Sequence, residues 1–240
     1  MADKQVKVEQ SDADAVVEKA KGFWAAYSKK IIIVGSVIIV LLGGYLGYKY
    51  FVQIPNEKEA NDLVFPAEKL FGLMASSSSY NKDTVNMVLN GDKAAGVTGL
   101  LKIANSYGGT KSGNRAQYMI GACYLNLKQF DKAVKHLKDF DGNGATQVQS
   151  KAYILLGHAY AEQKKTDDAL EYYKKAGNIS DLDEGMASEA LYMAGRYAEA
   201  LGKAKDATGI FEKLKDKYPA SQRVSSGDVD KYLASLGVTK

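Results

Sequence analysis

The sequence predicts an all-α protein in which a solenoid of stacked helical hairpins follows a single N-terminal transmembrane helix. Only three of the 240 residues are proline, the strongest helix breaker, while 46% are hydrophobic and 25% are charged, as in a globular protein. An uncharged apolar run lies near the N-terminus, and one pattern of small and large residues recurs three times after it. These three observations carry the prediction.

The composition excludes several classes of protein. The 32 basic and 28 acidic residues leave a net charge of only +4, which is too balanced for a dedicated nucleic-acid-binding protein. A single cysteine excludes an intramolecular disulfide framework, and two histidines leave little for a metal site. We therefore expect no nucleic-acid partner, no metal and no other cofactor.

The chain is expected to begin with a partly helical tail, residues 1–30. Residues 1–10 are expected to be disordered. From Asp12 to Trp24 the apolar residues follow a helical period, which indicates a helix that continues toward the apolar run.

The transmembrane helix is predicted at residues 31–50. Residues 31–48 contain no charged side chain and lie between Lys30 and Lys49. A helix of about 18–22 residues is roughly 27–33 Å long, which matches a hydrocarbon core of about 30 Å. Aromatic residues flank both ends, as at a membrane interface. The alternative is a buried core helix, but such helices rarely run this far without a charge.

The flanking residues indicate an uncleaved anchor with its N-terminus in the cytoplasm. A signal peptide is disfavoured because 30 residues precede the apolar run and no A-x-A cleavage site follows it. No cysteine follows directly for lipidation. Residues 14–30 contain four lysines, whereas residues 51–70 contain two, and lysine is enriched on the cytoplasmic side. In a bacterium, the chain would be a single-pass inner-membrane protein whose C-terminal domain is periplasmic.

Two glycines in the predicted span, Gly43 and Gly47, form a GxxxG motif. Such a motif lets two helices approach closely, and the alternative is that both glycines face lipid. The motif permits a homodimer and does not require one.

Three stretches of the larger domain align with one another and indicate internal repeats. They begin at Asn114, Ser150 and Ser188, and each has a glycine at the same position, Gly121, Gly157 and Gly195. An alanine follows each glycine after twelve residues and a large side chain after sixteen. Small residues let the two helices of a hairpin cross closely, and a hairpin that cannot bury its apolar face alone stacks on the next.

This pattern resembles the tetratricopeptide repeat (TPR). The second stretch matches it with Tyr153, Leu156, Gly157, Tyr160, Ala169, Tyr173 and Ala176, and Pro219 matches the closing proline of the last repeat. The resemblance implies a TPR-type α-solenoid with three repeats over residues 114–221. The spacings of 36 and 38 residues between the glycines, and Ala198 at an aromatic position, imply slightly longer helices or loops.

A degenerate first hairpin is predicted over residues 53–113. Tyr107 and Tyr218 end similar segments 111 residues apart, which is three periods of 37. We expect its first helix at residues 57–75, with Gly72 at the glycine position.

Two further segments complete the prediction. A polar insertion at residues 76–92 is expected inside the first hairpin, and its four serines favour a flexible segment over a functional one. A C-terminal capping helix is expected at residues 227–237, with Gly237 as its stop.

No catalytic centre is evident in the sequence. His136 and His158 are expected on different repeats without a metal-binding motif, and Cys123 lies on an apolar helix face as a small buried residue. The segment at residues 139–144 lacks the alternating carboxylates of a calcium loop. We therefore do not expect an enzyme.

The TPR resemblance implies a concave groove lined by the first helix of each repeat. The register places twelve residues there: Arg115, Tyr118, Ala122 and Leu125; Lys151, Ile154, His158 and Ala161; and Glu189, Tyr192, Arg196 and Glu199. The expected partner-binding residues are Arg115, Tyr118, Leu125, Lys151, His158, Tyr192, Arg196 and Glu199. The alternative is that they are ordinary solvated or supporting residues. The clamp with which some TPR domains hold a C-terminal carboxylate is not reproduced, because its asparagine positions hold Ala122, His158 and Arg196.

The layout of one N-in span followed by a TPR domain resembles the ancillary SecYEG translocon subunit (YfgM-like) family. This resemblance implies an accessory subunit of the Sec translocon that binds protein partners, namely translocon subunits and periplasmic chaperones. The alternative is a TPR scaffold of another envelope complex, such as an outer-membrane assembly, secretion or cell-division machine.

Overall fold

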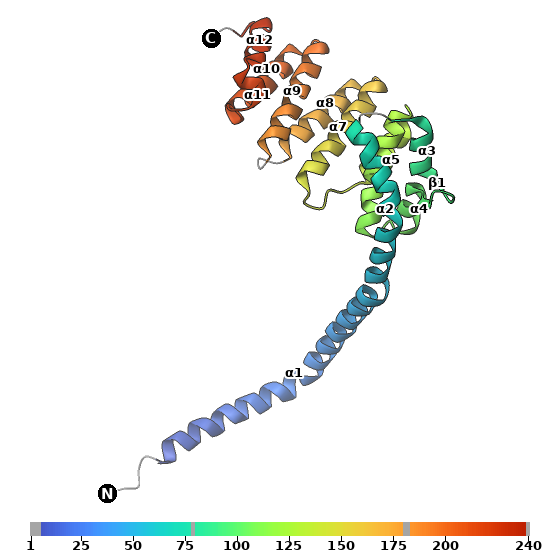
Figure 1. Ribbon diagram of the computed structural model, residues 1–240. Coiled ribbons are helices and arrows are strands. Elements are labelled where there is room, and N and C mark those ends of the chain that lie inside the picture. The colour runs from blue at the N-terminus through green and yellow to red at the C-terminus, as the bar shows by residue number, and fades with distance from the viewer. Residues whose placement is uncertain (1–5, 78–79, 180–182, 239–240) are drawn as a thin grey trace. The chain divides into compact units, whose positions relative to one another are not determined.

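The computed structural model describes residues 6–77, 80–179 and 183–238. It divides into two compact units, Met1–Pro55 and Asn56–Lys240. Within the described residues the protein is almost entirely helical, and the two strands form a single short hairpin (Figure 1). The predicted all-α class is confirmed.

The first unit is one long helix, α1 (Val6–Tyr48), followed by the π-helical segment η1 (Lys49–Gln53). Helix starts at Val6 because no proline or glycine interrupts residues 6–21, so the expected disorder of residues 1–10 is wrong for residues 6–10. Residues 1–5 lie outside the described residues. The large apolar side chains of residues 31–48 are all exposed.

The second unit, which begins at Asn56, contains all but the first two residues of α2 (Ile54–Ser77). Its buried face consists of Ala60, Val64, Ala67 and Met74. Gly72 lies outside this face with open space beside it, so its expected place at a close helix crossing is wrong. The reason is that the following segment does not return as one long helix.

That segment is the predicted insertion at residues 76–92, and the structure differs from the flexible loop expected there. Its described part contains α3 (Lys82–Asn90) and the start of a hairpin of β1 (Gly91–Asp92) and β2 (Val97–Thr98), followed by α4 (Leu100–Ser106). Asn81 caps α3 by accepting a hydrogen bond from the amide of Asp83 at 2.8 Å. The helix forms because Val85, Val88 and Leu89 recur at helical spacing and are buried in the core.

The hairpin pairs its strands antiparallel, with Gly91 opposite Thr98 and Asp92 opposite Val97. Gly91 has φ +87°, and a Cβ there would lie 2.6 Å from the amide nitrogen of Gly99. Only glycine fits this turn.

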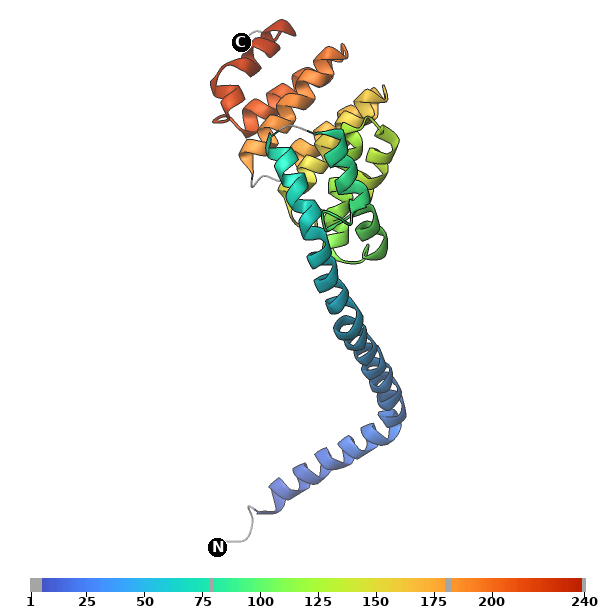
Figure 2. The same cartoon turned by 45° about the vertical axis from the view of Figure 1, so that its right-hand side comes forward.

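Three helical hairpins follow and stack in chain order (Figures 1 and 2). Their helices are α5 (Lys111–Asn126) with α6 (Phe130–Asp139), α7 (Thr146–Glu162) with α8 (Thr166–Asn178), and α9 (Glu184–Ala200) with α10 (Ala204–Lys217).

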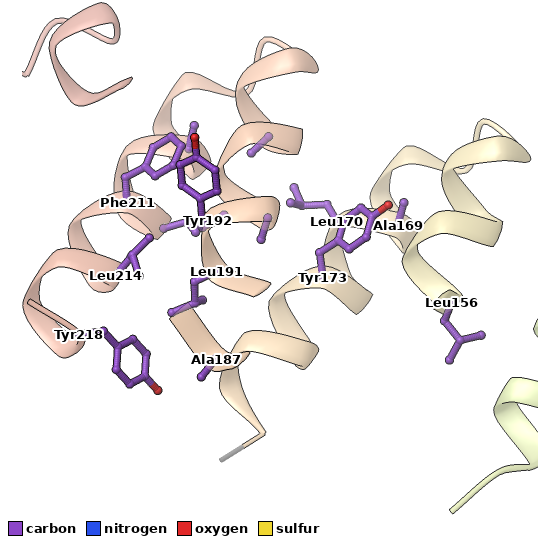
Figure 3. Packing of buried hydrophobic residues seen from close by; sticks show 14 of the residues in the cluster. Leu156, Ala169, Leu170, Tyr173, Ala187, Leu191, Tyr192, Phe211, Leu214 and Tyr218 are labelled. Carbon is purple, nitrogen blue, oxygen red and sulfur yellow. The ribbon is translucent and has the colours of Figure 1, made fainter. Parts of the chain in front are cut away.

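The small and large residues of the repeats meet as predicted. The glycines of the three first helices face Leu137, Tyr173 and Phe211 respectively, and Ala133, Ala169 and Ala207 are completely buried. Figure 3 shows the contribution of the last two repeats to this core, in which Tyr192 lies beside Phe211. The stacked-hairpin solenoid is therefore confirmed.

The chain ends with α11 (Gln222–Ser225) and α12 (Asp228–Ser235). Val229 and Leu233 of α12 are buried against the last hairpin, and the ring of Tyr232 stacks on Phe211 with centroids 5.2 Å apart. Gly237 has φ +84° and donates its amide to the carbonyl of Ala234. These elements cover the segment that the sequence assigns to a capping helix, and α11 is an additional short helix before it.

Candidate partner-binding groove

The eight expected partner-binding residues all lie on the first helices of the three hairpins. Arg115, Tyr118 and Leu125 are on α5, Lys151 and His158 are on α7, and Tyr192, Arg196 and Glu199 are on α9. Lys151 and Arg196 are exposed, Tyr192 is buried, and the others are half-buried. The residues on α5, α7 and α9 differ in the contacts that they make.

Two of the residues on α5, Arg115 and Tyr118, contact α2. Arg115 approaches α2, where its Nη2 donates to Oδ1 of Asn61 at 3.2 Å and lies 3.5 Å from Oε2 of Glu68. Tyr118 lies edge-on to Phe71 with centroids 6.3 Å apart, and burial raises the pKa of its hydroxyl. Arg115 also lines a hollow of about 630 Å³ next to Phe140 and Val148. The guanidinium there already has polar partners.

His158 on α7 is a packing residue of its own hairpin. Its Nδ1 lies 2.8 Å from the hydroxyl of Tyr173, whose ring faces Gly157. Burial lowers the pKa of the imidazole below its usual value, so His158 is neutral at pH 7. Lys151 lies two turns earlier on the same helix and is exposed to solvent.

The residues on α9 form a pocket of about 350 Å³ with residues of α8 and α11. Its walls are Tyr173, Glu189, Tyr192, Met193, Arg196, Tyr197, Ala200 and Arg223. Among the expected binding residues, it therefore brings together Tyr192 and Arg196 and does not include Glu199. We call this hollow the α9 pocket.

The two arginines of the α9 pocket differ in their partners. Arg223 holds the carboxylate of Glu189 with two hydrogen bonds of 2.8 Å, and its guanidinium lies 4.5 Å from the ring centroid of Tyr192. This ion pair raises the pKa of Arg223 further above its already high value. Arg196 lies over two rings, 6.0 Å from Tyr192 and 5.7 Å from Tyr232. It forms no ion pair with any residue that the structure describes.

The sequence prediction missed Arg223, because this residue lies in α11, beyond the last repeat. One signal in the sequence points to it. Only three of the 32 basic residues are arginine, and these are Arg115, Arg196 and Arg223. All three line the two hollows described above. Arginine, unlike lysine, presents a planar fork of donors and stacks on aromatic rings, so its rarity marks the positions that use these properties.

The remaining chemistry-bearing groups are the buried Cys123 and the half-buried His136. Cys123 is completely buried, as expected, and burial raises the pKa of its thiol to about 12. His136 lies with Nδ1 2.7 Å from Oε1 of Gln117. No group of three or more His, Cys, Asp or Glu side chains within the described ranges could hold a metal ion. The α9 pocket has the aromatic and charged side chains of a binding surface.

Comparison with known proteins agrees with this architecture. The model of the family described as tetratricopeptide repeat-like domain matches residues 21–224, and a search of curated proteins found no match. The matched region contains the three hairpins and the α9 pocket, and it reaches back into the apolar helix. That helix is long and apolar enough to cross a membrane, which makes it a candidate span by length and composition. Proteins of this kind are typically non-catalytic scaffolds for protein–protein interaction. The chain belongs to the tetratricopeptide repeat-like domain family.

Proposed function

We propose that this protein is a membrane-anchored adaptor whose TPR groove binds partner proteins. The α9 pocket carries the proposal, because it combines Tyr192 and two arginines at one exposed hollow. Tyrosine and arginine are the residue types most often found at the energetic centres of protein interfaces. In this proposal Lys151, Glu199, Leu125 and Arg115 extend the binding surface along the groove.

The proposed location is the bacterial inner membrane, with the TPR domain in the periplasm. The exposed apolar side chains of residues 31–48 support a membrane span, and the excess of lysines before the span supports a cytoplasmic N-terminus. The proposed partners are subunits of the Sec translocon and periplasmic chaperones, which rests on the resemblance of the layout to the ancillary SecYEG translocon subunit family.

Gly43 and Gly47 are the proposed contact site within the membrane. Apart from the adjacent backbone of α1 itself, neither glycine has an atom within 4 Å of where a Cβ would be, so both leave open space on the helix surface. Such a space suits close approach of another helix, either from a translocon subunit or from a second copy of this chain.

Photocrosslinking in intact cells tests the proposed function. A crosslinking amino acid would replace Tyr118, Tyr192 or Arg196, and Lys205 on the surface of α10 would serve as the control position. We expect discrete crosslinked proteins from the groove positions and none of them from Lys205. Recovery of Sec subunits or envelope chaperones would support the proposed partners.

Two other outcomes are informative. Crosslinks to outer-membrane assembly, secretion or cell-division proteins would favour a scaffold of another envelope complex over the Sec assignment. Identical crosslinks from the groove and from Lys205 would contradict a binding role for the groove.

A further inference from the structure

We infer that the α9 pocket recognises one acidic side chain, aspartate or glutamate, within an extended segment of a partner protein. The inference rests on the proposed adaptor function and names the chemistry that its groove selects. Three observations support the inference. They are the pairing of the charges around the pocket, the apolar side chains in its walls, and the length of the pocket along α9.

The charge of Arg223 is already neutralised within the fold. Its Nε and Nη2 each donate to the carboxylate of Glu189 at 2.8 Å, and its Nη1 lies 3.6 Å from Oδ2 of Asp228. A bidentate pair of this kind fixes both side chains. Arg223 and Glu189 therefore build one wall of the pocket and leave no charge for a ligand.

The charge of Arg196 remains available. Its guanidinium is oriented by the rings of Tyr192 and Tyr232, which offer no hydrogen-bond acceptor comparable to a carboxylate. Glu199 lies one turn further along α9 but is not within ion-pair distance of Arg196. The other nearby cation, Lys203, pairs with Asp167. The pocket therefore presents one unmatched positive charge.

A single arginine fork complements a single carboxylate. Arginine binds planar carboxylates through two parallel hydrogen bonds, which lysine does not reproduce. A phosphate carries about 1.5 to 2 negative charges at pH 7 and would require a second unpaired cation, which the pocket walls do not supply. The charge balance thus favours an acidic amino acid over a phosphorylated one.

The remaining walls specify the surroundings of that carboxylate. Tyr173, Met193 and Tyr197 line the pocket with aromatic and thioether surface, and the Tyr173 hydroxyl already has His158 as its partner. This surface suits an aliphatic or aromatic residue next to the acidic one. The walls on α9 run from Glu189 to Ala200, a distance of roughly 16 Å along a helix. A chain can therefore pass across the pocket, which favours an internal acidic side chain over a C-terminal carboxylate.

The test uses the full chain in detergent micelles and fluorescein-labelled octapeptide pools with capped ends. Three pools would have glutamate, glutamine or lysine at a fixed central position between leucine and phenylalanine, with the outer positions varied. A fourth would combine central glutamine with a free C-terminal carboxylate. Binding is measured by fluorescence anisotropy at two salt concentrations.

We expect the glutamate pool to bind at least about tenfold more tightly than the other three, and this preference to weaken at high salt. Arg196→Gln should abolish the preference, and Arg196→Lys should retain part of it because the charge remains without the fork. Lys205→Gln, which removes the same charge elsewhere on the surface, should leave it unchanged. Equal thermal midpoints of the variants would show that the fold is intact.

Several results would overturn the inference. These are equal affinity for the glutamate and glutamine pools, a preference that survives Arg196→Gln, and no binding of any pool. Tightest binding of the free C-terminal pool would assign the pocket to chain ends instead. If all pools bind equally while the groove crosslinks persist in cells, the adaptor function stands and only the acidic specificity fails.

Discussion

At the scale of single residues, close helix crossings depend on three glycines and the large side chains that face them. A Cβ added at Gly195 would lie 2.6 Å from Cε1 of Phe211, whose ring is completely buried between α9, α10 and α12. An added methyl would therefore have to displace this buried ring or separate the helices. The sequence revealed this contact because the same spacing of sixteen residues recurs in all three repeats.

Gly195→Ala is therefore expected to destabilise the protein. Overpacking of a filled core costs about 1–3 kcal/mol, which exceeds the gain in helix propensity. The matched control is Gly209→Ala on α10, where no atom lies within 4 Å of the added Cβ. That change should stabilise by about 0.5–1 kcal/mol. Thermal unfolding followed by circular dichroism would measure both, and an unchanged midpoint for Gly195→Ala would disprove the tight crossing.

The two histidines predict a dependence of stability on pH. Burial lowers the pKa of His158, and burial together with Lys135 lowers that of His136. The unfolded chain then binds more protons than the folded one below about pH 6.5. The contribution of the two neutral histidines to the free energy of unfolding should therefore be complete above about pH 6.5. It should fall as the pH is lowered through this value toward the pKa values of the folded protein.

Substitution separates this effect from other titrations. His158→Gln keeps a polar group near Tyr173 but does not titrate, so its midpoint should fall less between pH 7.5 and pH 5 than that of the natural chain. The double variant with His136→Gln should be flatter still. Parallel curves for all three proteins would contradict the assignment.

At the scale of elements, the turn inside each hairpin has the same backbone geometry but not the same residue. The position seven residues after each repeat glycine has positive φ, +57° at Lys128, +59° at Lys164 and +70° at Gly202. In each turn the next residue donates its amide back to the end of the first helix, as from Lys165 to Tyr160. Two of the three turns thus place lysine where glycine is preferred.

Lys164→Gly should stabilise the second hairpin. Left-handed backbone costs a lysine about 1–2 kcal/mol, and glycine avoids this cost. The greater freedom of glycine in the unfolded state offsets about 0.5–1 kcal/mol of the gain. A net gain of roughly 0.5–1 kcal/mol should appear as a higher unfolding midpoint. The reciprocal variant Gly202→Lys should lower it. A decrease for Lys164→Gly would show that the lysine side chain makes a stabilising contact.

The start of α5 is capped by a side chain from α2. The carboxylate of Glu57 accepts hydrogen bonds from the amides of Lys111 at 2.7 Å and Ser112 at 3.2 Å, while Thr110 accepts from Gly113 at 2.9 Å. These residues satisfy the free amides at the helix start and place a negative charge at its positive end.

Glu57→Gln should therefore loosen the junction of α2 and α5. The amide side chain provides one oxygen instead of two and no charge, so we expect a loss of about 1–2 kcal/mol. Hydrogen exchange of the amides of residues 111–113 should accelerate. Asp62→Asn removes the same charge from an exposed position on α2 and should change neither quantity. Unaltered exchange in Glu57→Gln would show that the cap is dispensable.

The sequence predicted the elements where a regular pattern repeats and failed where the pattern breaks. The three hairpins follow from their spacing, but α3 lies in a segment whose four serines favour a flexible insertion, although its residues Val85, Val88 and Leu89 are buried. The Glu57 cap could not be predicted, because it joins residues 54 positions apart that no repeat relates. Arg223 was missed for the same reason, since it reaches the α9 pocket from outside the repeats.

At the scale of the whole molecule, apolar exposure separates the two compact units. In the first, Ile39 and Val40 are each 71% exposed, and these values are typical of a helix surface that requires a membrane or a partner. In the second, the solenoid has its own hydrophobic core clusters, and the capping helix α12 contributes Val229 and Leu233 to one of them. Hydropathy along the chain located this boundary, because the apolar run is much longer than any other.

This division predicts that the two units can be separated experimentally. Deletion of residues 1–55 removes the exposed apolar helix but keeps Glu57 and the buried face of α2. We expect the full chain to stay in the membrane pellet after alkaline extraction and residues 56–240 to be soluble. Their unfolding midpoint should equal that of the solenoid in the full chain, because the core residues of the solenoid all lie beyond the cut. A truncated protein that is soluble but unfolded would show that the first unit stabilises the second, and release of the full chain by alkali would exclude a membrane anchor.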